Sequence, residues 1–243
     1  MQKKEPHSTA RLAPTMNSAS ASPFELYTEV AGLAEAEFHH NAERFKNHRA
    51  PDGGQGLKCR LGCTACCPHL FEISLLEAVM ISRVVNAMPQ EQQAALRERA
   101  REYKKQRQGL LDERAQKLKV EHIEGRLPVL GLRLACPALE GEACSVYNSR
   151  PLICRKFGMP IYDPRRPGQV GACELNFSPG EAIDDDGLVT RQTALFNRWE
   201  EVKREVEDRV GWGKRELTVA DAILEDFDGQ LARQGGLAGR NKS

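Results

Sequence analysis

The chain has 243 residues, of which 40% are hydrophobic and 28% charged, as expected for one large globular domain or two small ones. Its net charge of +1 gives no electrostatic reason to expect nucleic acid as a partner. No apolar run reaches the roughly 18 residues of a membrane span, and the N-terminus lacks the apolar core of a signal peptide. We therefore expect a cytoplasmic protein with no membrane and no nucleic-acid partner, in a reducing compartment where cysteines bind metals more often than they form disulfides.

The N-terminal part of the chain is expected to change from disorder to helix at residue 22. Residues 1–21 are rich in Ser, Ala and Pro and are predicted to be disordered. The segment Ser22-Pro23-Phe24-Glu25 forms a capping box with Pro at the first helical position. Apolar residues then recur at three- and four-residue steps from Tyr27 to Phe45, which predicts a helix with one buried face.

Two more helices are predicted before residue 120. Ser74 and Glu77 form a second capping box, which starts a helix through about Asn86. The segment from Pro89 to Lys119 has a strongly helical composition, with Gly109 as a candidate break.

Regular periodicity fades between residues 127 and 179, where Pro, Gly and four cysteines accumulate. Helical signal returns after Asp184-Asp185-Asp186-Gly187, with an apolar stripe from Leu195 to Val210, and a last short helix is predicted from Thr218. The predicted fold class is mainly α, with helices flanking an irregular cysteine-rich region and little or no sheet. We expect a single helical domain over residues 22–228, a cysteine-cluster core over residues 58–177 and a flexible tail over residues 229–243.

Half of the eight cysteines lie within nine residues, in the pattern C-x3-C-x2-CC: Cys59, Cys63, Cys66 and Cys67. Such short spacing allows several thiolates to converge from one loop on one metal centre. Adjacent side chains tend to diverge, so Cys66 and Cys67 fit poorly on one tetrahedral zinc ion and better on a polynuclear cluster or two metals. Four thiols together without a metal would oxidise readily, which argues against a purely structural role.

The other four cysteines are spread out: Cys136, Cys144, Cys154 and Cys173. Each alone could be a buried hydrophobic residue. Cys154 is the strongest candidate ligand of this group because Arg155 and Lys156 follow it and would favour its thiolate, whereas Cys173 stands outside the tight block. All eight cysteines are candidate metal ligands for an iron–sulfur cluster or zinc. His69 is a further candidate, as a ligand or as a donor to one.

The spacing Cys59-x3-Cys63-x2-Cys66 is also the cysteine pattern of radical S-adenosylmethionine enzymes. Those enzymes usually have an aromatic residue where this chain has Ala65, and they require a parallel β/α barrel. The chain lacks alternating strand and helix patterns, so we reject this assignment.

Two blocks in order resemble the bacterial CxxCxxCC family, a zinc- or iron-chelating domain of YkgJ-type cysteine cluster proteins. They are KCRLGCTACCPHLFEISLLEA and CPALEGEACSVYNSRPLICRKFG, and the resemblance covers about residues 58–158. The first spacing here is three residues rather than the two of the family name. Some relatives are described as iron–sulfur oxidoreductases, and longer flagellin lysine methylases share the motif, but we carry no catalytic residue over.

The resemblance implies a protein that binds a metal ion or cluster through both blocks. An iron–sulfur cluster with a redox or electron-transfer role is the leading hypothesis, which leaves enzymatic activity undecided. The alternative is a zinc module that serves as an interaction scaffold for an unknown protein partner or takes part in metal handling. Within the second block, Arg150 is expected to pair with the thiolates or with an acid such as Glu140 or Glu142, and Ser149 is expected to cap a helix near Pro151.

Overall fold

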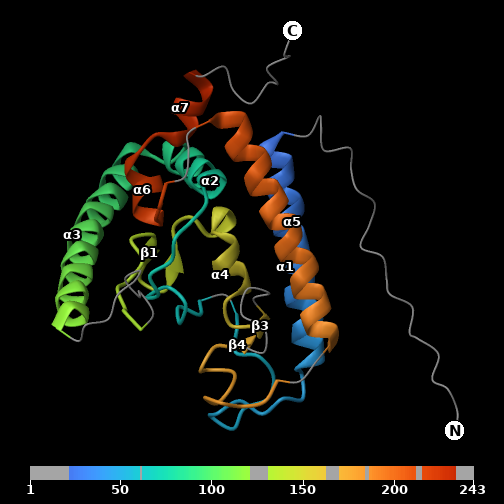
Figure 1. Cartoon of the computed structure of the whole chain (residues 1–243). Helices are drawn as coiled ribbons and strands as arrows, with labels where there is room; N and C mark the ends of the chain where they lie inside the picture. Colours follow the sequence, from blue (N-terminus) through green and yellow to red (C-terminus); the bar gives the residue numbers. More distant parts are fainter. Residues whose placement is uncertain are drawn as a thin grey trace, which may run out of the picture.

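A computed structural model describes residues 22–60, 62–120, 131–162, 170–183, 186–211 and 215–233 (Figure 1). The N-terminal segment 1–21, which we expect to be disordered, and the acidic residues 184 and 185 lie outside these ranges. The prediction of a mainly α fold is confirmed: the elements are seven α-helices, one short 3-10 helix and four two-residue strands within the described residues.

Two long helices, α1 (Pro23–Arg44) and α5 (Asp186–Val210), pack side by side and form one flank of the molecule (Figure 1). The predicted capping box starts α1, because Ser22 Oγ accepts from the backbone of Glu25 and the Glu25 carboxylate accepts from Ser22 N. Tyr27 and Trp199 meet edge to face with ring centroids 6.3 Å apart. The apolar stripe of α5 is buried as predicted, from Leu195 to Val210.

The helix α3 (Gln90–Val120) forms the opposite flank, and α2 (Leu75–Asn86), α6 (Val219–Leu224) and α7 (Phe227–Arg233) connect the flanks at one end (Figure 1). The expected break at Gly109 is wrong, because α3 continues through this residue; a single glycine costs only about 1 kcal/mol in a helix of this length. The helix α7 crosses residue 229, where we expected the tail to begin, and buries Leu231.

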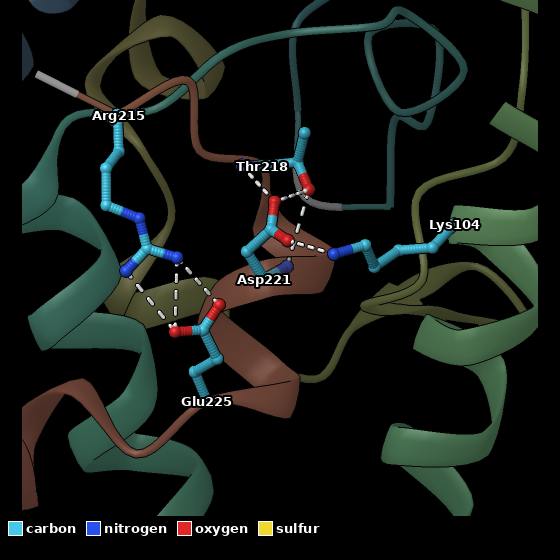
Figure 2. A network of polar contacts seen from close by, with 5 residues as sticks. All are labelled: Lys104, Arg215, Thr218, Asp221 and Glu225. Carbon is cyan, nitrogen blue, oxygen red and sulfur yellow. Dashed lines mark hydrogen bonds and ion pairs between the residues drawn. The ribbon is translucent and has the colours of Figure 1, made fainter. Parts of the chain in front are cut away.

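A polar network fixes α6 against α3 (Figure 2). The Thr218 backbone and hydroxyl both donate to the Asp221 carboxylate, at 2.8 and 2.6 Å, and form a capping box at the helix start that was predicted at Thr218. The other Asp221 oxygen accepts from Lys104 Nζ on α3 at 2.5 Å. Arg215 donates to Glu225, which lies about one helical turn after Asp221. Because Tyr103 and Val219 adjoin this network in sequence, it fixes the positions of two residues that also line the cavity described below.

The cysteine-rich part of the chain lies between the two flanks (Figure 1). It contains a hairpin of β1 (Leu139–Glu140) and β2 (Ala143–Cys144), then η1 (Tyr147–Ser149) and α4 (Leu152–Lys156). A second antiparallel pair, β3 (Ile161–Tyr162) and β4 (Val170–Gly171), follows. The strands of the described residues therefore form no parallel barrel, in agreement with the rejection of the radical-enzyme fold. Over the same residues, no helix combines the length and apolarity needed to cross a bilayer.

Candidate metal centre

The first cysteine group lies in the loop between α1 and α2, which folds as a series of tight turns. Cys63 N donates to Arg60 O at 3.0 Å, and Cys67 N donates to Thr64 O at 2.9 Å. Gly62 has a φ of +86°, a conformation that side-chain-bearing residues rarely adopt. These turns compact the loop, so that its four thiols stay within a short stretch of backbone.

The second group reaches the first through the backbone and through two short elements. Cys136 N donates to Cys67 O at 3.0 Å, which joins the end of the first loop to the start of the second block. Cys144 lies opposite Leu139 in the β1–β2 hairpin, and Cys154 lies on α4. The two cysteine groups, which are far apart in the sequence, are thereby brought together in space.

The thiols of both groups surround one cavity of about 270 Å³. Seven of the eight predicted site cysteines line it: Cys59, Cys63, Cys66, Cys67, Cys136, Cys144 and Cys154. The eighth, Cys173, is 6% exposed, lies on a turn and is not among the residues that line the cavity. All eight are free thiols.

Burial raises the pKa of several of these thiols, which favours their neutral form. Burial, with smaller contributions from neighbouring cysteines, raises the pKa of Cys136 to about 11. The hydrogen bond with Cys67, burial and the Cys67 charge raise the pKa of Cys66. Several thiolates cannot coexist here without a compensating cation, and thiolate is the ligand form that zinc and iron prefer. The donor set therefore fits a thiophilic metal or an iron–sulfur cluster.

The sequence-based view of Cys154 needs a correction. We expected Arg155 and Lys156 to favour its thiolate, but burial and the charges of Cys66 and Cys136 raise the pKa of Cys154 well above its usual value. The Arg155 guanidinium points to Glu35 and to the backbone carbonyl of Asn148 instead.

The thiols line the cavity wall and do not yet meet at a point. In the part of the chain that the structure describes, no three Cys, His, Asp or Glu side chains have the arrangement of a metal-binding group. Ligation therefore requires the thiols to lie closer to one another than they do here.

Two arginines and one glutamate form a polar cluster within the cavity wall. Glu35 Oε1 accepts from Arg150 at 3.1 Å and from Arg155 at 2.6 Å. Arg150 therefore pairs with an acid, as one expectation stated, but this acid is Glu35 rather than Glu140 or Glu142; Glu140 binds Arg99 instead. The positive charge of Arg150 lowers the pKa of Cys66 and of Cys144, although burial has the larger, opposite effect. Arg150 therefore favours the thiolate form of both residues, in line with the expectation that it interacts with the thiolates.

His69 lines the cavity, but its Nε2 atom already contacts Arg133 Nη1 at 2.6 Å. Its ring packs against Phe157, with centroids 4.5 Å apart, and stacks on Phe71. Burial and then the Arg133 charge lower the pKa of His69. Because an arginine donates to Nε2, this nitrogen is an acceptor already in use, so ligation through it would require Arg133 to move.

Sequence reasoning missed several residues of the wall, notably Glu35, Phe38 and Phe157. Glu35 lies on α1, far in sequence from the cysteines, and a glutamate on an amphipathic helix is normally a solvated residue. Phe157 lies three residues after Cys154 and within the second block that resembles the family, so its place in that block was a signal that the sequence offered.

A helical frame around a cavity lined by thiols from two distant segments defines a cysteine-cluster metal-binding protein. Residues 58–167 match the CxxCxxCC family, described as "Putative zinc- or iron-chelating domain", which confirms the resemblance of the two cysteine blocks. This segment covers somewhat less than half of the chain and ends before Cys173. No curated protein and no solved structure matches the chain significantly.

Proposed function

We propose that this protein holds an iron–sulfur cluster through cysteines of both groups and uses it in electron transfer. The observation that carries the proposal is that seven cysteines from two distant segments line one cavity. Cys66 and Cys67 bring two thiols from adjacent residues into mutual hydrogen-bond contact in the cavity wall, and an iron–sulfur cluster can take several thiolates from one loop. A bound iron–sulfur cluster supplies one-electron redox chemistry, which zinc lacks.

The chain's own residues would hold such a centre and set its surroundings. The cavity thiols are the ligands, and the Arg150 charge, held in place by Glu35, offsets part of the negative charge of the thiolates. Aromatic rings from Phe38, Phe71 and Phe157 line the same cavity and make part of its wall apolar. An apolar environment and nearby positive charge are both means by which proteins adjust the potential of a cluster.

The cavity is within reach of a protein partner. His39 and Arg60, which line it, are exposed, and Tyr147 is 40% exposed. An opening to the surface suits a centre that exchanges electrons with another protein, whereas a purely structural metal site is normally closed by its own ligands. The free thiols suit a reducing compartment, and a cytoplasmic location belongs to this proposal.

Zinc is the second candidate, because the matched family is described as chelating either metal. Thiolates arranged around zinc would join the two cysteine segments and act as a scaffold for a partner, or would exchange the ion in metal handling.

The test is to purify the full chain without air, record its visible absorption and measure iron, acid-labile sulfide and zinc. A coloured protein with iron and sulfide in similar amounts supports the cluster. A colourless protein with stoichiometric zinc and no iron overturns the redox proposal and favours the scaffold. A protein that carries neither metal, with its fold intact by circular dichroism, contradicts both.

A further inference from the structure

The side chain of Asn176 connects the two cysteine blocks. Its Oδ1 atom accepts a hydrogen bond from Lys58 N, directly before Cys59, at 2.6 Å. Its Nδ2 atom donates to the carbonyl of Gly158, the last residue of the second block. The side chain is fully buried, and Asn176 lies beyond residue 167, where the match to the family ends. One amide from outside the matching segment therefore fixes the start of the first block against the end of the second.

The same amide has a donor left for the thiol of Cys59. The N–H of Lys58 needs an acceptor and the carbonyl of Gly158 needs a donor, so only one orientation of the Asn176 amide satisfies both. In this orientation Nδ2 also donates to Cys59 Sγ, at an N···S distance of 3.5 Å. The two bonds to the backbone would suffice for a purely structural role, and the third bond goes to a thiol that lines the cavity.

Asn176 is itself held in place from two sides. Asn176 N donates to Cys173 O at 2.8 Å within a tight turn. From the loop after α1, His48 Nε2 donates to Asn176 O at 2.7 Å, and the His48 ring stacks on Phe177 with centroids 4.4 Å apart. A donor that is fixed in this way is preorganised, so little conformational freedom is lost when it bonds to the sulfur.

Cys59 Sγ has two polar neighbours of opposite kinds. The thiol donates to Phe157 O in a long contact of 3.9 Å and accepts from Asn176 Nδ2. Because metal binding removes the thiol proton, the sulfur of a bound Cys59 has no hydrogen left for the Phe157 carbonyl. The bond from Asn176 remains, and hydrogen bonds to an ionised acceptor are roughly twice as strong as neutral ones. Asn176 therefore favours the ligand form of Cys59 over the free thiol.

We propose that Asn176 positions Cys59 as a metal ligand and donates a hydrogen bond to its thiolate in the metal-bound protein. Residues that bond to a ligating group orient it and tune the metal, and their loss costs roughly 10–100-fold in metal affinity. This inference rests on the proposed function only in that the cavity must hold a metal centre with Cys59 among its ligands. It requires no assignment of the other ligands, and it applies to zinc and to an iron–sulfur cluster alike.

The test measures the zinc affinity of the full-length chain, freed of metal and handled without air, by competition with a chelator. Asn176→Leu removes the amide at a similar side-chain volume and should weaken zinc binding roughly tenfold or more. His48→Phe is the matched control, because it removes the bond to Asn176 O but keeps an aromatic ring beside Phe177 and the bond from Asn176 to Cys59. The zinc affinity of this control should stay close to that of the wild type.

A double-mutant cycle distinguishes the bond to sulfur from a purely structural role. Cys59→Ala removes the sulfur but leaves the bonds of Asn176 to Lys58 and Gly158, and six other cysteines of the cavity can still bind zinc. Asn176→Leu should therefore weaken zinc binding much less in the Cys59→Ala background than in the wild type. If the wild type holds an iron–sulfur cluster, Asn176→Leu should also lower its reduction potential, because a hydrogen bond to sulfur stabilises the reduced, more negative state.

The outcomes separate this inference from the proposed function. A wild-type chain that takes up neither zinc nor iron contradicts the proposed function, and the role of Asn176 falls with it. Equal zinc affinities in Asn176→Leu and His48→Phe, or an equal effect of Asn176→Leu with and without the Cys59 sulfur, overturn the role of Asn176 alone. If Asn176→Leu loses its helical circular dichroism, Asn176→Asp takes its place. Its carboxylate can still accept from Lys58 N but has no N–H for Cys59, so it must show the same dependence on the Cys59 sulfur.

Discussion

Glu77 Oε1 accepts a hydrogen bond from the backbone N–H of Leu152 at 2.7 Å, across 75 residues of sequence. The other carboxylate oxygen accepts from Ser74 N and Oγ in the capping box of α2. One buried carboxylate therefore caps both α2, which follows the first cysteine group, and α4, which carries Cys154. The expected cap from Ser149 is wrong, since α4 begins after Pro151 with no cap from a side chain within this segment.

We predict that Glu77→Gln destabilises the protein more than Ser74→Ala does. Removal of an N-cap hydroxyl costs about 1 kcal/mol. In the wild type, Ser74 and Leu152 donate to two different oxygen atoms of Glu77, whereas the amide of Gln has only one oxygen that can accept. A buried N–H therefore loses its partner, and the loss of unfolding free energy rises to about 2–4 kcal/mol. Chemical unfolding followed by circular dichroism measures both values. An equal loss in the two variants would show that the Leu152 bond contributes nothing.

Most of the helices of the frame could be predicted from the sequence, because capping boxes and apolar stripes are local signals. Ser22, Ser74 and Thr218 start helices as expected, and the stripe from Leu195 to Val210 is buried. It could not show which partner each polar side chain would choose. Arg150 binds Glu35, and Glu77 reaches Leu152, because tertiary packing brings together residues more than 70 positions apart. Convergence of both cysteine groups was foreseen only through the family resemblance.

A pH dependence is predicted for the α3–α6 contact in Figure 2. Burial alone would raise the pKa of Asp221, but the hydrogen bonds from Lys104 and Thr218 together lower it. A lowered carboxyl pKa means that the stabilisation is present above the unfolded-state pKa and is lost as the pH falls through the folded-state value. The gap in unfolding free energy between wild type and Asp221→Asn, about 1–2 kcal/mol near neutral pH, should therefore shrink below about pH 4.

Glu225→Gln is the control for that measurement, because Glu225 binds Arg215 in the same network but is an exposed pair. Such pairs contribute about 0–1 kcal/mol. A gap for Asp221→Asn that stays constant from pH 7 to pH 3 would refute the assigned role of its charge.

Removal of the Arg150 charge should weaken metal retention. This side chain is 17% exposed, and its charge lowers the pKa of both Cys66 and Cys144. Loss of about 1 kcal/mol of attraction between it and the thiolates corresponds to roughly fivefold weaker binding. Competition with a zinc chelator should show this shift for Arg150→Gln but not for Arg215→Gln, which removes an equal charge beside Glu225. Equal retention in the two variants would contradict the electrostatic role.

Gly158→Ala should displace the Cys59 thiol and reduce metal content. Gly158 has a φ of +105°, and a Cβ added there would collide with Cys59 Sγ. Gly180→Ala is a matched control, because Gly180 also has a positive φ, +80°, but has no atom within 4 Å of an added Cβ. Both variants bear a backbone strain of about 1–2 kcal/mol. Only Gly158→Ala should also lose metal by elemental analysis, because only there must a cavity thiol move. Unchanged metal content in Gly158→Ala, at a stability similar to that of Gly180→Ala, would show that the position of Cys59 does not matter for binding.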